Sequence, residues 1–322
     1  MEQLISQKIY SELMVARHPV FVCDERIDGD SLGAALAVAD LLHGLGRDWP
    51  MIHVSGPIPE MYHHLPHLDI CTDQNQVLAN SEVDLIVVFD CSDGLYVERL
   101  LSHAPRSACV INIDHHKTNP LYGDIHLVDV EAAATAEVVY RFFEHNRVVP
   151  SREAATCLLT GMCFDTTAFS NSATNDRVLQ TASELVLLGA SIHDIVRSLY
   201  QNRSVPSLRL WGTALERLHF NSAFDCVMTC VTRKDMDEHG VDDEEIGGLS
   251  NFLSLTTDTD TLYFLRETEQ GGVKVSMRSS VRDVSAVARE NGGGGHERAA
   301  GYTIENAKLV CGDNGCWRVE KG

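Results

Sequence analysis

Three short apolar runs in the first third of the chain each lead straight into acidic residues. Unbroken apolar runs of this length are typical of strands buried on both faces of a parallel sheet. Helix-like patterns separate them, which predicts βαβ units. Open α/β sheets build their sites at the carboxyl ends of the strands, so these acids are expected to meet there. The runs are Val20–Cys23, which leads into Asp24; Leu85–Phe89, which leads into Asp90; and Cys109–Ile113, which leads into Asp114-His115-His116.

The apolar patterning predicts an α/β protein of two domains and a connecting segment. A mainly parallel-sheet N-terminal domain is expected over residues 1–190, a linker helix region over 191–222, and a second, smaller α/β domain over 223–322. A further strand is predicted over 51–54 and another over 224–231, and residues 261–266 and 273–278 are predicted to form a hairpin. The predicted helices cover residues 2–17, 31–45, 95–103, 132–145, 152–164, 175–188, 208–218, 242–254 and 284–290.

The composition limits the cellular environment and the binding partners that can be expected. The 322 residues are 44% hydrophobic, enough for a sizeable core, yet no apolar stretch approaches the roughly 20 residues that cross a bilayer. The polar N-terminus does not resemble a signal peptide, so a cytoplasmic protein without membrane contact is expected. A formal net charge of −20 argues against binding to long duplex nucleic acid, but it does not exclude small anionic substrates.

The ten cysteines favour neither disulfides nor a zinc site. Most lie inside apolar runs, where a reduced thiol behaves as a small hydrophobic group. No Cys-x-x-Cys pair is present. Cys311 and Cys316, near the C-terminus, are the one pair that could bridge locally, and a reducing compartment disfavours that bridge.

The acidic positions fit a metal-ion site. Asp28 and Asp30 lie two residues apart on a predicted loop, so each carboxylate could reach a different ion, and Asp90 at a strand end could bridge the two. For each acid the alternative is a turn or a helix cap. Oxygen-rich sites with one or two imidazoles suit Mn²⁺ or Mg²⁺ better than Zn²⁺.

The histidine pair and a later aspartate extend this site. His115 is the natural imidazole ligand, and Asp114 is placed to orient it or a neighbour. His116 is a candidate to face a substrate phosphate or to give a proton to the leaving oxygen. Asp165 ends an apolar helical run, where the helix dipole disfavours an acid, so a ligand role is favoured over a helix-end role.

The second domain carries a glycine run with polar neighbours. Four glycines in a row are compatible with a flexible linker. Here, however, they lie between a helical pattern and an apolar segment, where backbone N–H groups can approach an anion closely. Arg278 adds a guanidinium suited to phosphate, with a surface arginine as the alternative. The candidate substrate-binding residues are Arg278, Ser279, Gly292, Gly293, Gly294, Gly295, His296 and Arg298.

Together, these motifs in this order resemble the DHH phosphoesterase family. The resemblance covers nearly the whole chain, and it is closest to the short two-domain members. It implies an active site in the interdomain cleft and two divalent ions, expected to be Mn²⁺. One ion would be held by Asp24, Asp28 and Asp90, and the other by Asp30, Asp90, His115 and Asp165. One departure matters: Asp24 stands where the family has histidine, which adds negative charge and shortens the reach.

The implied reaction is hydrolysis of short oligonucleotides to 5′-mononucleotides, of 3′,5′-adenosine bisphosphate to AMP, or of both. A cyclic-di-AMP phosphodiesterase is the alternative, and a manganese-dependent pyrophosphatase shares the first-domain motifs. A nucleotide-binding sensor with an impaired metal site is the non-enzymatic alternative, supported by Asp24 alone. A homodimer is expected by analogy only.

Overall fold

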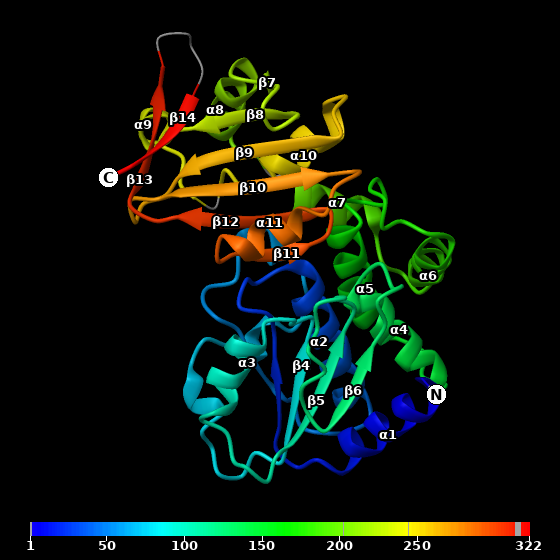
Figure 1. Ribbon diagram of the computed structural model, residues 1–322. Helices are drawn as coiled ribbons and strands as arrows, with labels where there is room; N and C mark the ends of the chain where they lie inside the picture. Colours follow the sequence, from blue (N-terminus) through cyan, green and yellow to red (C-terminus); the bar gives the residue numbers. More distant parts are fainter. Residues whose placement is uncertain (1, 202, 244, 313–316) are drawn as a thin grey trace. The chain divides into compact units, whose positions relative to one another are not determined.

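The computed structural model describes residues 2–201, 203–243, 245–312 and 317–322, without the side chains of Leu255 and His296. The chain divides into two compact units, Met1–Gln201 and Asn202–Gly322 (Figure 1).

The first unit is built on a six-stranded parallel sheet with the strand order β3-β2-β1-β4-β5-β6. The central strands are uniformly apolar, and every residue of β4 is buried. The chain winds from β1 towards β3 and then crosses back, so the order reverses between β1 and β4. Ligand sites of open α/β sheets lie at such a reversal. The strands are β1 (Pro19–Val22), β2 (Met51–His53), β3 (Cys71–Thr72), β4 (Leu85–Phe89), β5 (Cys109–Asp114) and β6 (Ile125–Val128).

Seven α-helices and three short 3₁₀ helices accompany this sheet in the described part of the first unit (Figure 1). α2 and α5 pack so closely that a Cβ on Gly33 would overlap the backbone of Cys157, which explains the glycine. The α-helices are α1 (Glu2–Val15), α2 (Gly29–Gly44), α3 (Gly94–Leu101), α4 (Thr135–His145), α5 (Arg152–Asp165), α6 (Asp176–Leu187) and α7 (Ile192–Tyr200). The 3₁₀ helices are η1 (Glu60–Tyr62), η2 (Leu68–Ile70) and η3 (Asn75–Val77).

In the first unit, two helix starts differ by two or more residues from the sequence-based prediction, and in the second unit the helix predicted over 242–254 begins at Leu249. α2 begins at Gly29 rather than residue 31, because the Asp28 side chain accepts the backbone N–H groups of Asp30 and Ser31 as an N-cap. Asp30 therefore lies in the first helical turn and not on a loop. α4 begins at Thr135 rather than residue 132, and its N-cap residue Ala134 has no capping side chain. β3 and β6 lie outside the prediction, because β3 has only two residues and the exposed His126 interrupts β6.

The second unit contains a mixed six-stranded sheet, ordered β11-β12-β10-β9-β8-β7, and a two-stranded sheet of β13 and β14. The predicted hairpin is confirmed by the antiparallel pairing of β9 with β10. The strands are β7 (His219–Asn221), β8 (Cys226–Val231), β9 (Thr261–Glu267), β10 (Val273–Ser279), β11 (Gly294–His296), β12 (Ala299–Ile304), β13 (Ala307–Cys311) and β14 (Trp317–Lys321). The helices are α8 (Val205–Glu216), α9 (Arg233–His239), α10 (Leu249–Thr256) and α11 (Val284–Glu290).

The helix predicted over residues 208–218 begins earlier, at Val205. Ser204 caps it, and Pro206 occupies its first turn, where proline needs no hydrogen-bond donor. The first turn is also one of the few helical positions that a proline stabilises, so the proline starts this helix instead of preceding it.

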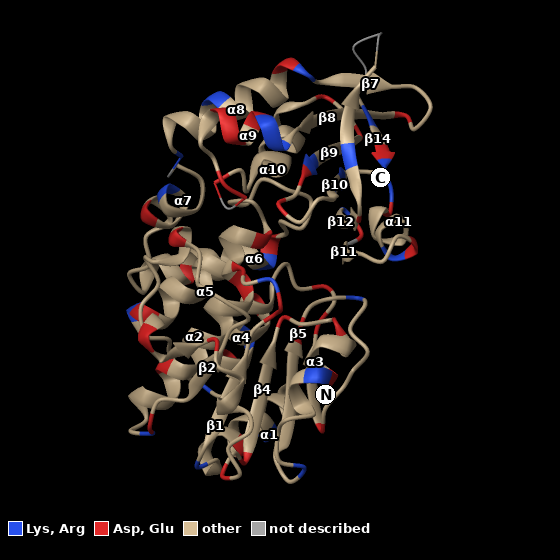
Figure 2. Cartoon of the chain, turned by 90° about the vertical axis from the view of Figure 1, so that its left-hand side faces the viewer, with Lys and Arg blue, Asp and Glu red and all other residues tan. Residues whose placement is uncertain are grey.

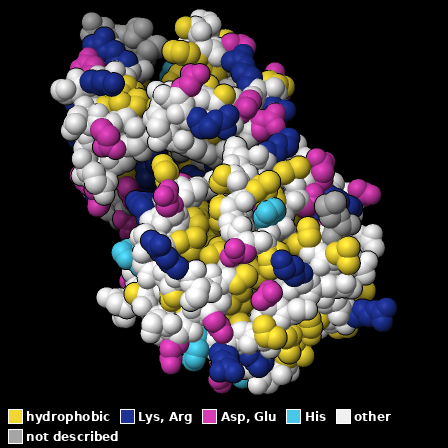
Figure 3. Space-filling view, turned by 60° about the horizontal axis from the view of Figure 1, so that its bottom comes forward, with side chains coloured by type: hydrophobic (Ala, Val, Ile, Leu, Met, Phe, Trp, Pro, Cys, Tyr) yellow, Lys and Arg dark blue, Asp and Glu magenta, His cyan; other side chains and the backbone are white. Residues whose placement is uncertain are grey.

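Other features of the described residues bear on the sequence analysis. Their cysteines are all free, while Cys316 lies outside the described residues. Within the described ranges, no helix combines the length and the apolar character needed to span a bilayer. On the face shown in Figure 3, lysine and arginine side chains are scattered among acidic ones.

Candidate metal centre

The carboxyl ends of β1, β4 and β5 and the end of α5 bring acids and imidazoles together in the first unit. Figure 2 shows acidic residues, in red, around the upper ends of β4 and β5. Two groups of three side chains have potential ligand atoms within 4.8 Å of one another. One group is Asp90, His115 and His116, and the other is Asp30, His115 and Asp165. His115 belongs to both groups, so five side chains from four separate parts of the sequence form one cluster.

The loop after β1 delivers Asp28, and the first turn of α2 delivers Asp30. One Asp28 oxygen caps α2, with N···O distances of 3.1 Å to Asp30 and 2.9 Å to Ser31. The Asp30 side chain is fully buried and accepts two backbone N–H groups of α4, from Thr135 at 2.6 Å and from Ala136 at 2.8 Å. Asp30 therefore caps a helix other than its own, and the positive end of α4 helps to keep its carboxylate in place.

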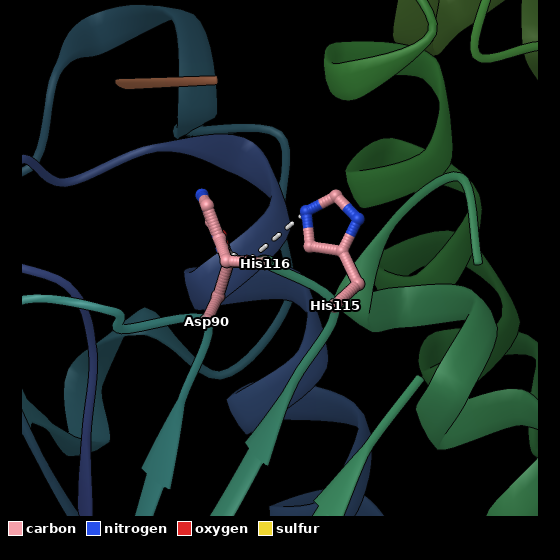
Figure 4. A group of neighbouring side chains, drawn as sticks. All are labelled: Asp90, His115 and His116. Atoms are coloured by element: carbon pink, nitrogen blue, oxygen red, sulfur yellow. Dashed lines mark ion pairs between the residues drawn. The ribbon is translucent and has the colours of Figure 1, made fainter. Parts of the chain in front are cut away.

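Asp90 follows the last residue of β4 in the left-handed backbone region, with φ of 58°. Aspartate is one of the few non-glycine residues that tolerate this region. The Asp90 N–H still donates to Ile113 of β5 at 2.9 Å, which fixes the turn to the neighbouring strand. The Asp90 Oδ1 accepts the Thr135 hydroxyl at 2.7 Å and lies 3.5 Å from both His115 Nε2 and His116 Nδ1. Asp90 thus faces both histidines (Figure 4).

Asp114 organises the histidine pair from the end of β5. Its Oδ1 accepts the backbone N–H groups of His115 and His116 at 2.7 and 3.0 Å, and the ring Nδ1 of His116 at 2.7 Å. Asn119 donates to its other oxygen. Burial alone would raise the pKa of Asp114, but the hydrogen bonds and charge of His116 and the Asn119 amide lower it instead. Asp114 therefore acts as a carboxylate that orients His116.

His115 presents its ring to the acids. Its Nδ1 lies 3.1 Å from the Ala132 carbonyl, which can only accept, so Nδ1 carries the proton. The opposite ring atom, Nε2, lies 3.0 Å from Asp165 and 4.0 Å from Asp30. Burial by itself would lower the pKa of His115, but the hydrogen bond and charge of Asp165, together with Asp30 and Asp114, raise it to about 10.

Asp165 is the last residue of α5, and an unusual turn follows it. Three consecutive non-glycine residues, Thr167, Ala168 and Phe169, have φ between 50° and 63°. The turn is held by the Ala168 N–H on Cys163 at 2.7 Å and by the Asn171 amide on the Asp165 carbonyl at 2.7 Å. Left-handed residues of this kind cost about 1 kcal/mol or more each. Such strain is common where a side chain must be held in place.

The buried acids of the cluster hold more negative charge than the site readily accommodates without a cation. Burial, followed by the charge of Asp165, raises the pKa of Asp28 to about 7. Burial and the neighbouring carboxylates likewise raise the pKa values of Asp30 and Asp90 well above the usual range. Carboxylates with imidazole form a donor set that suits Mn²⁺ or Mg²⁺, and dications would offset this charge. The residues therefore fit the predicted metal site.

Asp24 is the predicted ligand with the weakest link to the cluster. It belongs to neither group of converging ligand atoms. It does lie near Asp28, because its charge contributes to raising the pKa of that acid after burial and Asp165. It also interacts with the Cys91 thiol, whose pKa is raised by burial first and then by Asp24. The role of Asp24 as a ligand stays a prediction.

The predicted substrate-binding residues lie together in the second unit, around β10, β11 and β12. Arg278 of β10 donates from Nε to Asn251 at 2.8 Å and from Nη1 to the Met277 carbonyl at 2.8 Å. Arg298 pairs with Glu297 at 3.7 Å. The Ser279 hydroxyl organises its own turn, since it donates to the Asp260 carbonyl and accepts the N–H of Arg282.

The glycine run is part of a strand rather than a linker. β11 pairs antiparallel with β12. A Cβ on Gly293 would overlap the Gly301 backbone, and Gly295 has φ of 131°, so both positions require glycine. Gly292 also has a positive φ, whereas a Cβ on Gly294 would meet nothing within 4 Å. The His296 side chain lies outside the described residues, so its role stays a prediction.

Five groups at the centre escaped the sequence analysis: the Thr135 hydroxyl and N–H, the Ala136 N–H, the Ala132 carbonyl and the Asn119 amide. Backbone groups carry no sequence signal of their own. Asn119, three residues after His116 in a short polar turn, could have been singled out as a partner for Asp114. Thr135, at the start of a helix that follows three alanines, offered a similar but weaker signal.

Comparison with known proteins shows the family and agrees with the fold. Residues 19–162 match the N-terminal domain of the DHH family, and residues 225–311 match the DHHA1 domain. The chain belongs to the DHH family, which confirms the resemblance drawn from its motifs.

Individual relatives match along most of the chain. A Thermus thermophilus protein named bifunctional oligoribonuclease and PAP phosphatase NrnA is 32% identical over 286 residues, which are 88% of this chain and 82% of that protein. The Bacillus subtilis protein of the same name is 23% identical over 304 residues, 92% of this chain and 90% of that protein. A crystal structure of an exopolyphosphatase-related protein from Bacteroides fragilis has a TM-score of 0.83 at 24% identity, covering 93% and 91% of the two chains. That likeness supports the α/β fold.

Proposed function

We propose that this protein is a divalent-metal-dependent phosphoesterase that hydrolyses short oligonucleotides to 5′-mononucleotides and 3′,5′-adenosine bisphosphate to AMP. The observation that carries the proposal is the buried cluster of Asp30, Asp90, His115 and Asp165 at the strand-order reversal. The substrate class follows from the relatives, which are named as oligoribonucleases and phosphatases.

The proposed ligands are the acids of the cluster and His115. Asp30, Asp90, His115 and Asp165 would hold one ion, and Asp90 would be shared with a second. Asp28 and Asp24 would complete the second site. When bound, two Mn²⁺ ions would lower the pKa of water and neutralise charge on the phosphoryl oxygens.

The chain itself supplies orientation and a proton. Asp114 holds the ring of His116 through Nδ1 at 2.7 Å. With Nδ1 bound to a carboxylate, the opposite nitrogen Nε2 is the atom through which the ring can exchange a proton. We therefore propose that His116 donates a proton to the leaving oxygen, with Asp114 stabilising the charged ring.

Residues of the second unit would recognise the nucleotide. Arg278 and Arg298 carry guanidinium groups suited to phosphate oxygens. Arg298 lies between β11 and β12, and Arg278 of β10 pairs with Ala299 at the start of β12. Gly292 and Gly294, around which packing leaves open space, are the glycines best able to give their backbone to a ligand. Ser279 and His296 belong to the same proposed surface. The absence of long duplex partners and the homodimer stay predictions.

A substrate panel tests the proposal. Purified full-length protein with Mn²⁺ is incubated with pApA, pGpG, 3′,5′-adenosine bisphosphate, cyclic-di-AMP and pyrophosphate, and the products are separated by chromatography. We expect 5′-mononucleotides from the linear dinucleotides and AMP from the bisphosphate. Turnover of cyclic-di-AMP alone would support the cyclic phosphodiesterase, and phosphate from pyrophosphate alone would support a pyrophosphatase. Tight binding of a dinucleotide without turnover would identify a sensor.

A further inference from the structure

One segment between β6 and the first turn of α4 contacts three members of the metal centre. The Ala132 carbonyl lies 3.1 Å from His115 Nδ1. The Thr135 and Ala136 N–H groups bind the Asp30 carboxylate, and the Thr135 hydroxyl binds Asp90 at 2.7 Å. All six of these partners are buried. The position of residues 132–136 therefore sets the positions of an imidazole and two carboxylates together.

The Ala132 carbonyl is held from both sides. Before it, the Glu131 carbonyl accepts a hydrogen bond from Arg177 Nη2 at 2.7 Å. After it, the Ala133 N–H donates to Glu137 Oε2 at 2.7 Å. Arg177 comes from α6, 46 residues along the chain from Glu131, so the segment is tied to a separate helix. The Ala133 N–H belongs to the same planar peptide group as the Ala132 carbonyl. With this group and the preceding one both fixed, the carbonyl has little freedom to rotate away from His115.

Glu137 and Arg177 also meet each other. Glu137 is completely buried, and an unpaired carboxylate there would be costly. Arg177 Nε lies 3.7 Å from Glu137 Oε1, and its Nη1 lies 3.9 Å from Asp129 Oδ2. Arg177 stands in the first turn of α6, where the helix dipole disfavours a cation. Helix stability gives no reason for an arginine at this position, whereas its contacts with residues 129–137 do.

We propose that Glu137 and Arg177 are positioning residues for the metal centre. They act through the Ala132 carbonyl, which keeps the proton of His115 on Nδ1 and leaves Nε2 to face Asp165, Asp30 and Asp90. Partners of this kind fix the tautomer and ring orientation of a ligating histidine. The inference rests on the proposed metal-binding function of the centre, and it adds two residues that never touch the ion or the substrate.

Titration of metal-free, full-length protein with Mn²⁺ by calorimetry tests this role without depending on turnover. Glu137→Ala removes the acceptor of the Ala133 N–H and is expected to weaken Mn²⁺ binding about tenfold. Glu137→Gln keeps a side-chain oxygen for that N–H and is expected to recover most of the loss. Arg177→Met is expected to weaken binding several-fold, and Arg106→Met, at an exposed arginine in the turn before β5, is expected to leave it unchanged.

Nitrogen-15 NMR of the histidine rings gives a second readout that a purely structural role would not move. The spectra are recorded with diamagnetic Mg²⁺ bound, because the metal-free ring carries both protons at neutral pH and Mn²⁺ is paramagnetic. The wild-type protein is then expected to hold the His115 proton on Nδ1, and Glu137→Ala is expected to mix the two tautomers. Melting curves show which variants fold. If Glu137→Ala does not fold, the Mn²⁺ affinity of Arg177→Met tests the inference in its place. Folded variants that bind Mn²⁺ as tightly as the wild type would overturn the inference. Failure of the wild type itself to bind Mn²⁺ would instead overturn the proposed function.

Discussion

The carboxylate of Asp30 accepts the backbone N–H of Thr135 at 2.6 Å, so an acid from α2 caps a helix whose own N-cap, Ala134, has no side chain for the task. The same carboxylate lies among the potential metal ligands, so one side chain caps a helix and is also placed to serve the proposed metal site. From the sequence, a helix-capping role and a metal-ligand role are alternatives for each acid. At Asp30 the two roles are compatible.

Asp30→Ala should therefore lose both stability and metal binding. With Mn²⁺ present at pH 7.5, we expect the free energy of unfolding to fall by about 2 kcal/mol or more, because two α4 N–H groups lose their acceptor and an ion loses a ligand. Asp93→Ala is the matched control, since Asp93 caps α3 through Leu95 and Tyr96. It should cost about 1 kcal/mol and keep Mn²⁺ binding. Equal Mn²⁺ affinity in Asp30→Ala and the wild type would contradict the ligand role.

Gly161→Ala should disturb the centre through packing alone. A Cβ at Gly161 would lie 2.6 Å from Asp30 Oδ1 and 2.7 Å from the Ala136 side chain, so the carboxylate would have to move. We expect a loss of about 1–3 kcal/mol in unfolding free energy and weaker Mn²⁺ binding. Gly44 lies in α2, the helix of Asp30, and a Cβ there would meet nothing within 4 Å. Gly44→Ala should therefore raise the free energy of unfolding by about 0.5–1 kcal/mol. Denaturant titration distinguishes the two, and a Gly161→Ala protein as stable as the wild type would show that the helices separate at little cost.

Asp114→Asn should reduce kcat more than it changes KM. Its side chain would keep an oxygen for the backbone N–H groups but lose the carboxylate that stabilises a charged His116 ring. We expect a fall of about 10- to 100-fold in kcat, the range typical of an orienting partner. Asp124→Asn serves as the control, because Asp124 accepts a backbone N–H from Val110 at the other end of β5. Steady-state kinetics on a linear dinucleotide gives the comparison, and an unchanged kcat in Asp114→Asn would remove His116 from the proposed chemistry.

The stabilisation of the folded protein by Mn²⁺ should increase as pH rises. The folded-state pKa of Asp28 is raised to about 7, above an unfolded value near 4, so the metal-free protein loses stability as pH rises between them. The raised pKa of His115, about 10, acts in the same sense: its contribution is complete below about 6.5 and is lost as pH rises through 10. Mn²⁺ competes with these protons. We expect the rise in melting temperature on adding Mn²⁺ to be larger at pH 8 than at pH 6.

The control for this pH effect is Asp28→Asn, in which the difference between pH 6 and pH 8 should shrink. Differential scanning fluorimetry at both pH values measures it. A larger Mn²⁺ effect at pH 6 than at pH 8 would mean that the cluster does not hold its protons as described.

The sheet of the first unit was predictable because its central strands are apolar along their whole length. Leu85–Phe89 is apolar and buried along its whole length, and Cys109–Ile113 is apolar except for the buried Asn112. β3 has only two residues, and Ile125–Val128 exposes His126, so neither shows that signal. β11 was hidden for a different reason, since its glycines are set by close approach to β12 and not by strand propensity.

Most of the candidate centre was also predictable, because strand ends meet at one edge of a parallel sheet. Asp90, His115 and Asp165 converge as expected, and Asp30 does so from a helix rather than a loop. The supporting groups were not predictable from residue types. The Ala132 carbonyl and the N–H groups of α4 exist in every sequence, and only the tertiary fold decides which of them face a carboxylate or an imidazole.

Calorimetric titration of the metal-free wild type and Asp90→Asn with Mn²⁺ asks directly whether buried acids from separate strands hold divalent ions. Asp90 is the decisive residue, because it lies 3.5 Å from both histidines and is the proposed shared ligand. We predict saturable binding of two ions per chain in the wild type, and loss of at least one of them in a folded Asp90→Asn protein. Absence of saturable binding in the wild type, or two ions bound with unchanged affinity in Asp90→Asn, would contradict the account.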